Sequence, residues 1–335
     1  MKFFRRRPWA DCAPGQLVDV GTHRLHVQCT GWGTPTVVFD SALAGSVLSW
    51  TLIQPAVATF TRACSYDRAG HGWSDAGPMP RTLSRIVDEL HALLSHSDIR
   101  PPLVLVGHSY GGLVTQLYAS RYPEDIAGMV LVDPAHAKDW ARVHGRERER
   151  LETGIRLCRR GAAAARLGIS SLVAAMVGAG ALAMARVSAK VISGGVLSRQ
   201  HEEILAPILL LPPHLRPLLR RMWSRPEFFD AVGSQMAALR SDALALLATA
   251  DRGYGDLPLV ALSSSNPEPS RIVDQEHLAA LSSRGRHIVA RHSGHWIPLE
   301  EPELVVQAIR DVTELARGSH RRSPEHSRAQ RGSQT

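Results

Sequence analysis

Residues 103–112, LVLVGHSYGG, constrain the fold of this chain more than any other segment. An apolar run typical of a buried strand leads into Gly107-His108-Ser109-Tyr110-Gly111, and a helical pattern follows as far as Arg121. A serine at such a strand-to-helix turn has a strained backbone, and its neighbours must approach closely, which requires glycines. The turn lifts the hydroxyl above the sheet at a helix N-terminus, which favours developing negative charge. We therefore predict that Ser109 is a nucleophile.

Short β-branched runs alternate with helical patterns through the first third of the chain and again near its end. Runs at 17–20 and 25–29 predict a hairpin, and apolar runs predict buried strands at 35–40, 63–66, 103–107, 129–133, 257–262 and 287–291. Helical spacing predicts helices at 82–95, 109–121, 275–283 and 302–315. This alternation favours an α/β fold with a mostly parallel sheet covered on both faces.

The alternation stops between residues 137 and 252, where Ala, Leu and Arg predominate and only helices are predicted. We predict an α/β core at 17–136 and 253–317, with a helical cap at 137–252 inserted after the sixth strand. Residues 1–16 form a basic N-terminal segment, and the polar residues 318–335 predict a disordered tail.

A serine hydroxyl needs a general base. The segment Ser293-Gly294-His295-Trp296 follows the last predicted strand, where such a base is expected in chain order. His292 is the only close rival and lies nearer to the strand. We predict that His295 is the base.

Three segments together resemble the α/β-hydrolase superfamily, in its branch of cap-bearing esterases and related hydrolases. They are GHSYGG, YDRAGHGWSD at 66–75 and SGHWIPLEEPELV at 293–305. The resemblance spans roughly 17–137 and 257–315, and implies a triad ordered Ser, acid, His and an oxyanion hole of two backbone amides. One amide is that of Tyr110, after the nucleophile. The other lies after the third strand, where Ala42 replaces the glycine usual in relatives and Leu43 is expected to donate.

The acid of the triad has several candidates in the sequence. Many relatives carry an aspartate after the strand that follows the cap, where this chain has Asn266, which could orient His295 but not compensate its charge. Glu268 or Asp274 could reach in from the same loop. Some members of the superfamily take the acid from the strand before the cap, where MVLVDP places Asp133. We predict Asp133, with Glu268 and Asp274 as alternatives.

Other polar residues of these motifs have simpler interpretations. Asp67 and Arg68 are expected to hold their own loop, and His71 and Trp73 to shape the site. His26 has no partner in the sequence and is interpreted as a surface or core histidine.

Composition excludes several classes of partner. The formal net charge of +8 comes almost entirely from arginine, without a nucleic-acid-binding motif, so we expect solvated surface and no nucleic acid. The four cysteines form no C-x-x-C pair and no metal-ligand spacing, which predicts reduced thiols, no metal and no cofactor in a cytoplasmic protein. Residues 167–185 are uncharged and near membrane-spanning length, but rich in Ala, Gly and Ser; they predict a buried or interfacial helix pair, and leave peripheral membrane contact open.

The sequence thus predicts a metal-independent hydrolase that cleaves an ester-like bond, a carboxylic ester or a lactone, through an acyl-enzyme. The cap would line an apolar pocket for a small apolar substrate. Two alternatives stay open: a non-catalytic ligand-binding member, favoured by Asn266, and a membrane-associated lipid hydrolase, favoured by residues 167–185 and the arginine clusters. The sequence does not indicate an oligomeric state.

Overall fold

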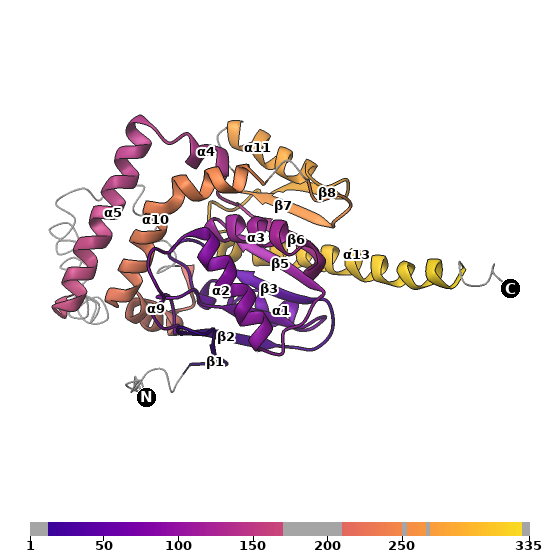
Figure 1. Cartoon of the computed structure of the whole chain (residues 1–335), viewed down its shortest axis with the longest axis horizontal. Helices are drawn as coiled ribbons and strands as arrows, with labels where there is room; N and C mark the ends of the chain where they lie inside the picture. The colour runs from indigo at the N-terminus through magenta and orange to yellow at the C-terminus, as the bar shows by residue number, and fades with distance from the viewer. Residues whose placement is uncertain (1–12, 170–209, 250–252, 266–268, 330–335) are drawn as a thin grey trace.

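The computed structural model describes residues 13–169, 210–249, 253–265 and 269–329 (Figure 1). An eight-stranded sheet lies at its centre, in the order β1-β2-β4-β3-β5-β6-β7-β8. The strands are β1 (Gln16–Asp19), β2 (Arg24–Thr30), β3 (Thr36–Asp40), β4 (Ala63–Tyr66), β5 (Leu103–His108), β6 (Ile126–Val132), β7 (Leu259–Ser263) and β8 (Gly285–Val289). β2 is antiparallel to β1 and β4, and all other neighbours are parallel, which confirms the predicted fold class.

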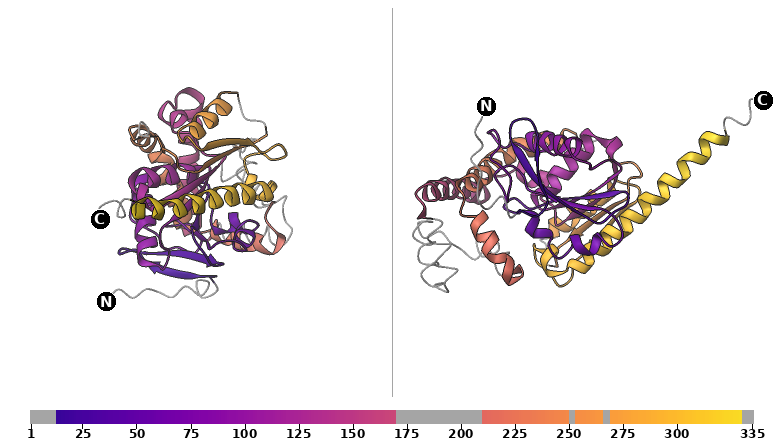
Figure 2. Two further views of the ribbon diagram at one scale, coloured as in Figure 1. Left: turned by 90° about the vertical axis from the view of Figure 1, so that its right-hand side faces the viewer. Right: turned by 90° about the horizontal axis from the view of Figure 1, so that it is seen from below.

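Helices surround this sheet (Figure 2). The α-helices are α1 (Gln54–Val57), α2 (Leu83–His96), α3 (Tyr110–Arg121), α4 (Ala137–Ala141), α5 (Gly145–Arg166), α9 (Arg216–Met222), α10 (Pro226–Leu247), α11 (Pro269–Ala280), α12 (Ile297–Glu300) and α13 (Pro302–Ala329). The short 3₁₀ helices are η2 (Val47–Trp50), η3 (Pro123–Asp125) and η4 (Pro213–Leu215).

Two apolar layers enclose the sheet because successive side chains of a strand point to opposite faces. On β5, Leu103 and Leu105 belong to one core cluster, together with apolar side chains of α2 and α3. Val104 and Val106 belong to the other, with side chains of α1 and α13. A strand buried on both faces needs a continuous apolar run, which is the pattern that the sequence shows here.

Every described element between β6 and β7 is helical. α10 packs along α5 and against α4, and it also contacts α2 and α3 of the core. α5 and α10 lie side by side at one end of the molecule (Figures 1 and 2). The cap at 137–252 as a separate domain stays a prediction, since 170–209 and 250–252 lie outside the described residues. Most of the uncharged segment 167–185 lies there too; none of the described helices is long and apolar enough to cross a bilayer.

The last described helix, α13, continues to Ala329 (Figure 1), and 330–335 lie outside the described residues. A disordered tail at 318–335 stays a prediction. Val305, Ile309 and Val312 of the same helix are buried against the sheet. Once such a docked stretch has formed, each further helical residue adds a hydrogen bond without a new nucleation cost.

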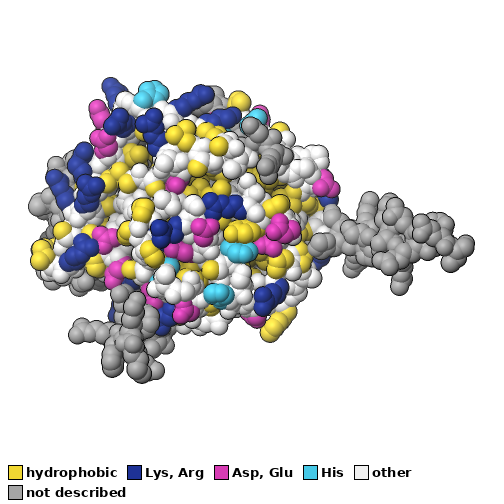
Figure 3. Space-filling view, in the orientation of Figure 1, with side chains coloured by type: hydrophobic (Ala, Val, Ile, Leu, Met, Phe, Trp, Pro, Cys, Tyr) yellow, Lys and Arg dark blue, Asp and Glu magenta, His cyan; other side chains and the backbone are white. Residues whose placement is uncertain are grey.

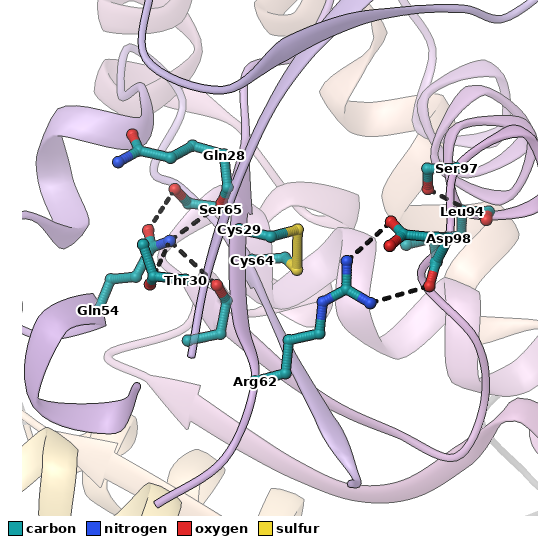
Figure 4. The surroundings of a disulfide bond; sticks show 11 residues. Gln28, Cys29, Thr30, Gln54, Arg62, Cys64, Ser65, Leu94, Ser97 and Asp98 are labelled. Atoms are coloured by element: carbon teal, nitrogen blue, oxygen red, sulfur yellow. Dashed lines mark hydrogen bonds and ion pairs between the residues drawn. A yellow bond between two sulfur atoms is a disulfide. The ribbon is translucent and has the colours of Figure 1, made fainter. Parts of the chain in front are cut away.

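The prediction of reduced thiols is wrong for two of the cysteines. Cys29 and Cys64 form a disulfide between β2 and β4 (Figure 4). The antiparallel register of these strands places the two residues directly opposite one another, with their Cα atoms 4.1 Å apart. Their separation of 35 residues in the sequence gave no sign of this pairing. Beside it, the Gln54 amide donates to the carbonyl of Gln28 and so fastens β2 to α1 (Figure 4).

Candidate active site

Ser109 lies at the tight turn between β5 and α3. Its backbone has φ 54° and ψ −116°, and its amide donates to the carbonyl of Val132 on β6 at 3.0 Å. A Cβ atom on Gly111 would lie 2.3 Å from the Asp40 carbonyl oxygen, and one on Gly107 would lie 2.4 Å from that of Gly111. The close approach that the motif predicts is therefore present. A non-glycine residue at positive φ is costly, and such strain concentrates at functional sites.

Ser109 forms a hydrogen-bonded chain with two residues that are distant in the sequence. Nε2 of His295 lies 3.0 Å from Oγ of Ser109, and Nδ1 of His295 lies 2.6 Å from Oδ2 of Asp133. With the proton on Nδ1, the ring donates to Asp133 and accepts from the serine hydroxyl. The three residues follow the carboxyl ends of β5, β6 and β8, which meet at one edge of the sheet.

Backbone contacts fix Asp133 in this place. It too has a positive φ, 38°, which aspartate tolerates better than most residues. Its amide donates to the carbonyl of Leu262 on β7 at 2.7 Å, and its Oδ1 accepts from the amide of Ser264 at 3.3 Å. The carboxylate is buried, so water competes little for its hydrogen bonds.

Of the two alternative acids, Asp274 is described and is not the partner of His295. Asp274 interacts electrostatically with His136. Burial lowers the pKa of the His136 imidazole, and the negative charge of Asp274 opposes that shift. Asn266 and Glu268 lie outside the described residues. His292 is exposed, and its backbone amide donates to Oε1 of Glu301 at 2.6 Å.

Two further residues, which were not among the predicted site residues, fix the loop that carries His295. Nε2 of His108 donates to the carbonyl of His295 at 2.8 Å, and burial, then the nearby His295, lowers the pKa of His108 to about 3. His108 is therefore a neutral positioning group. Oε2 of Glu300 accepts from the amide of Gly294 at 2.9 Å. His108 lies in the motif segment GHSYGG and Glu300 in SGHWIPLEEPELV. Membership of these segments was the only sign in the sequence that the two residues belong to the site.

A buried ion pair organises the loop after β4. Nδ1 of His26 lies 2.8 Å from Oδ2 of Asp67, and neither side chain is exposed. Burial by itself would lower the pKa of His26, but the hydrogen bond and charge of Asp67 raise it above the usual value. Asp67 also accepts from the amides of Val47 and Trp73, at 2.9 and 3.0 Å. His26 is thus a core histidine with a partner that the sequence did not reveal.

The two predicted oxyanion donors belong to different segments of the chain. Tyr110 is the first residue of α3, and Leu43 lies in the loop between β3 and η2. Within the described part of the chain, neither backbone amide donates to another backbone carbonyl outside its own element. Their joint use as an oxyanion hole stays a proposal.

Comparison with known proteins identifies a family. A sequence model described as "alpha/beta hydrolase fold" matches residues 35–302. The uncharacterized protein YqjL of Bacillus subtilis is 39% identical over 100 residues, which are 30% of this chain and 40% of YqjL. Lipase LipV of Mycobacterium tuberculosis is 43% identical over 77 residues, 23% of this chain and 29% of the lipase. The matched segments thus cover less than half of these relatives' own length.

Solved structures share the fold over most of their length. An esterase from Thermogutta terrifontis superimposes with a TM-score of 0.62 at 21% identity, covering 90% of this chain and 99% of the esterase. The enol-lactonase of Burkholderia xenovorans gives a TM-score of 0.60 at 18% identity, covering 89% and 99%. An epoxide hydrolase, CorEH, gives 0.62 at 17% identity, covering 89% and 97%. At these identities the likeness shows the fold alone.

Proposed function

Because the chain belongs to the α/β-hydrolase fold family, we propose that it is a serine hydrolase which cleaves a carboxylic ester or a lactone through an acyl-enzyme at Ser109. The observation that carries this proposal is the chain of hydrogen bonds from Ser109 through His295 to Asp133. A serine alone is a weak nucleophile, and this arrangement supplies both the base and the group that orients it.

The proposed reaction follows from the positions of these atoms. His295 Nε2 takes the hydroxyl proton as Ser109 Oγ bonds to the substrate carbonyl carbon, and the Asp133 carboxylate stabilises the imidazolium. The backbone amides of Leu43 and Tyr110 would hold the oxyanion. His295 then gives its proton to the leaving oxygen. Water enters, and its oxygen bonds to the acyl carbon as His295 takes one of its protons. The second tetrahedral intermediate then breaks the bond to Ser109 Oγ, which receives that proton from His295, and the acid leaves.

The nucleophile separates this proposal from epoxide hydrolysis. Relatives that open epoxides or remove halides carry an aspartate at the elbow, and this chain has Ser109. A serine with a histidine base fits attack on the carbonyl of an ester or a lactone, and the same triad serves amides and carbon–carbon bonds as well.

A small apolar cavity beside the site indicates where part of the substrate would bind. It lies between the Leu43–η2 segment, α9 and Trp296, whose ring packs edge-on to that of His295 with centroids 5.8 Å apart. Its volume is about 10 Å³, roughly the room of one water-sized group. We propose that it takes the terminal methyl group of a short acyl chain. Its lining residues are Ala44, Gly45, Leu48, Ser49, Leu211, Leu219, Trp223, Trp296 and Leu299.

The alternatives now have different support. The non-catalytic interpretation was based on Asn266 in place of an acid. The contact between Asp133 and His295 supports the catalytic interpretation instead. Peripheral contact with an anionic membrane stays a second proposal, because every arginine of α5 is exposed. Lys and Arg side chains are visible at the end of the molecule where α5 lies (Figure 3). A cytoplasmic location also stays a proposal, now without support from the cysteines, because disulfides are rare in that compartment.

A substrate panel tests the proposed function. Purified wild-type protein would be assayed with aryl esters from acetate to octanoate, a γ-lactone and a styrene-type epoxide, next to Ser109→Ala. We expect turnover of esters or the lactone and its loss in the variant. Turnover of the epoxide alone would contradict the proposal, as would ester turnover that survives in Ser109→Ala.

A further inference from the structure

The guanidinium of Arg68 binds the loop that follows β3 and does not hold only its own loop. Nη1 donates to the carbonyl of Ser41 at 2.7 Å, and Nη2 donates to the carbonyls of Ala42 and, at 3.3 Å, of Leu43. Nη1 also pairs with Oδ1 of Asp40 at 2.5 Å. One side chain therefore contacts four consecutive residues of the segment that carries the proposed oxyanion donor.

Two more side chains complete this set of contacts. Nε2 of His71 donates to the carbonyl of Leu43 at 2.9 Å, and Nε1 of Trp223 donates to that of Ala44 at 3.1 Å. Burial, then the charge of Arg68, lowers the pKa of His71 to about 3, so the ring is neutral and has a single N–H. The shorter of its two carbonyl contacts, the one to Leu43, takes that proton. The carbonyls of residues 41–44 are thus all fixed by side chains.

These contacts determine where the amides of the loop point. In a planar trans peptide the carbonyl and the following N–H point in opposite directions. When Arg68 holds the carbonyl of Ala42, the N–H of Leu43 must point away from Arg68. If the peptide between Ala42 and Leu43 rotated, the carbonyl oxygen of Ala42 would take the place of the Leu43 N–H. The oxyanion would then face the negative end of the peptide dipole.

Arg68 is itself held rigidly. It is 4% exposed, and the hydroxyl of Tyr66 donates to the second oxygen of its partner Asp40. Burial raises the pKa of Asp40, and the charge of Arg68 opposes that shift. The guanidinium carbon lies 5.1 Å from the centroid of the Tyr110 ring, so Arg68 also packs against the residue that carries the second proposed donor.

We propose that Arg68 is a positioning residue that presets the oxyanion hole by turning the carbonyls of residues 41–43 away from the reacting carbonyl. The catalytic part of this proposal rests on the proposed function. Lysine cannot replace arginine here, because a single ammonium group cannot span these carbonyls in a fixed plane.

The kinetic test compares Arg68→Lys with Asp40→Asn. In Arg68→Lys, kcat should fall about 10²-fold, the size of effect seen when one oxyanion donor is removed, with KM changed less than about threefold. The inhibition constant of a trifluoromethyl ketone, which forms an oxyanion on the serine, should rise by a similar factor. Asp40→Asn removes the charge of the ion pair but keeps a side-chain oxygen that can accept from Nη1, together with the carbonyl contacts, so its kcat should stay within about threefold of wild type. Equal loss of kcat in both variants would show that the ion pair matters, and would overturn the proposal.

Hydrogen–deuterium exchange provides a readout that does not need turnover. The peptide that covers residues 41–46 should exchange at least about tenfold faster in Arg68→Lys than in wild type, while peptides of β5 and β6 keep their rates. Unchanged exchange in residues 41–46 would overturn the proposal even if kcat fell. A wild-type protein without hydrolytic activity would refute the proposed function, and the exchange rates would then decide whether Arg68 fixes this loop.

Discussion

Asp133 Oδ2 lies 2.6 Å from Nδ1 of His295, although 162 residues separate the two in the chain. The carboxylate thus follows β6, the strand before the helical insertion. After β7, the strand that follows the insertion, this chain has Asn266 where many relatives carry an aspartate. The sheet makes this exchange possible, because β6 and β7 are adjacent and parallel and their carboxyl ends meet at the same edge. An acid at the end of either strand can therefore reach the same imidazole.

Asp133→Asn should reduce kcat by about 10⁴-fold, because the amide can no longer fix the histidine tautomer or stabilise the imidazolium. Stability should change little, since asparagine is isosteric and also tolerates the positive φ of 38°. The matched variant Asn266→Asp should leave kcat within about threefold in the wild-type background. Steady-state kinetics and thermal unfolding of the three proteins would test this. An Asp133→Asn enzyme with near wild-type kcat would show that another group supplies the acid.

Asp242→Asn should stabilise the protein near neutral pH. Asp242 on α10 accepts from the amide of Leu83 at the start of α2, and burial raises its pKa to about 6, above the ordinary 3.8. An acid with a raised pKa contributes stability that is complete below about pH 3.8 and is lost as the pH rises through about 6. The amide oxygen of the substituted side chain would still accept from Leu83, and no charge would be buried.

Urea unfolding from pH 4 to pH 7 measures this effect. The variant should match wild type at pH 4 and exceed it by on the order of 2 kcal/mol at pH 7. Asp88→Asn, at an exposed carboxylate of α2, is the control and should show no such trend. A constant difference between Asp242→Asn and wild type across this pH range would contradict the account.

Leu219→Ala should shift the preference toward longer acyl chains. Leu219 on α9 is 3% exposed and lines the small cavity beside His295, whereas its neighbour Leu218 is 37% exposed. Each methylene that gains burial is worth about 0.8 kcal/mol. The ratio of kcat/KM for hexanoate over acetate should therefore rise roughly tenfold in Leu219→Ala and stay unchanged in Leu218→Ala. If both variants scale all chain lengths equally, the cavity does not bind the acyl group.

Gly111→Ala should destabilise the protein by more than about 1 kcal/mol, because its Cβ would lie 2.3 Å from the Asp40 backbone, which cannot move aside cheaply. Gly318 lies in α13 with open space around it, so Gly318→Ala should be neutral or slightly stabilising. Equilibrium unfolding of both variants measures the difference. Equal stability would mean that the close approach at the turn is not rigid.

Much of the core could be predicted from the sequence because the signals there are local. The apolar runs of β3, β5 and β6 report burial on both faces, and the glycines around Ser109 report a close backbone approach that holds in the structure. The region 137–252 carried no comparable signal, because its Ala-, Leu- and Arg-rich sequence contains no turn motif and no strand pattern that fixes its arrangement.

Long-range partners outside the chain of Ser109, His295 and Asp133 could not be predicted. The Cys29–Cys64 bond depends on the register of β2 against β4, which no motif in either strand specifies. Arg68 was expected to hold its own loop, since nothing in YDRAGHGWSD indicates that its guanidinium reaches residues 40–43.

Covalent labelling of Ser109 tests the central claim most directly. Wild-type protein, Ser109→Ala and Asp133→Asn would be treated with a fluorophosphonate, and the modified residue would be located by peptide mass spectrometry. The account predicts one adduct on Ser109 in wild type, none in folded Ser109→Ala, and slower labelling of Ser109 in Asp133→Asn. An adduct on another residue, or labelling that persists in Ser109→Ala, would contradict it.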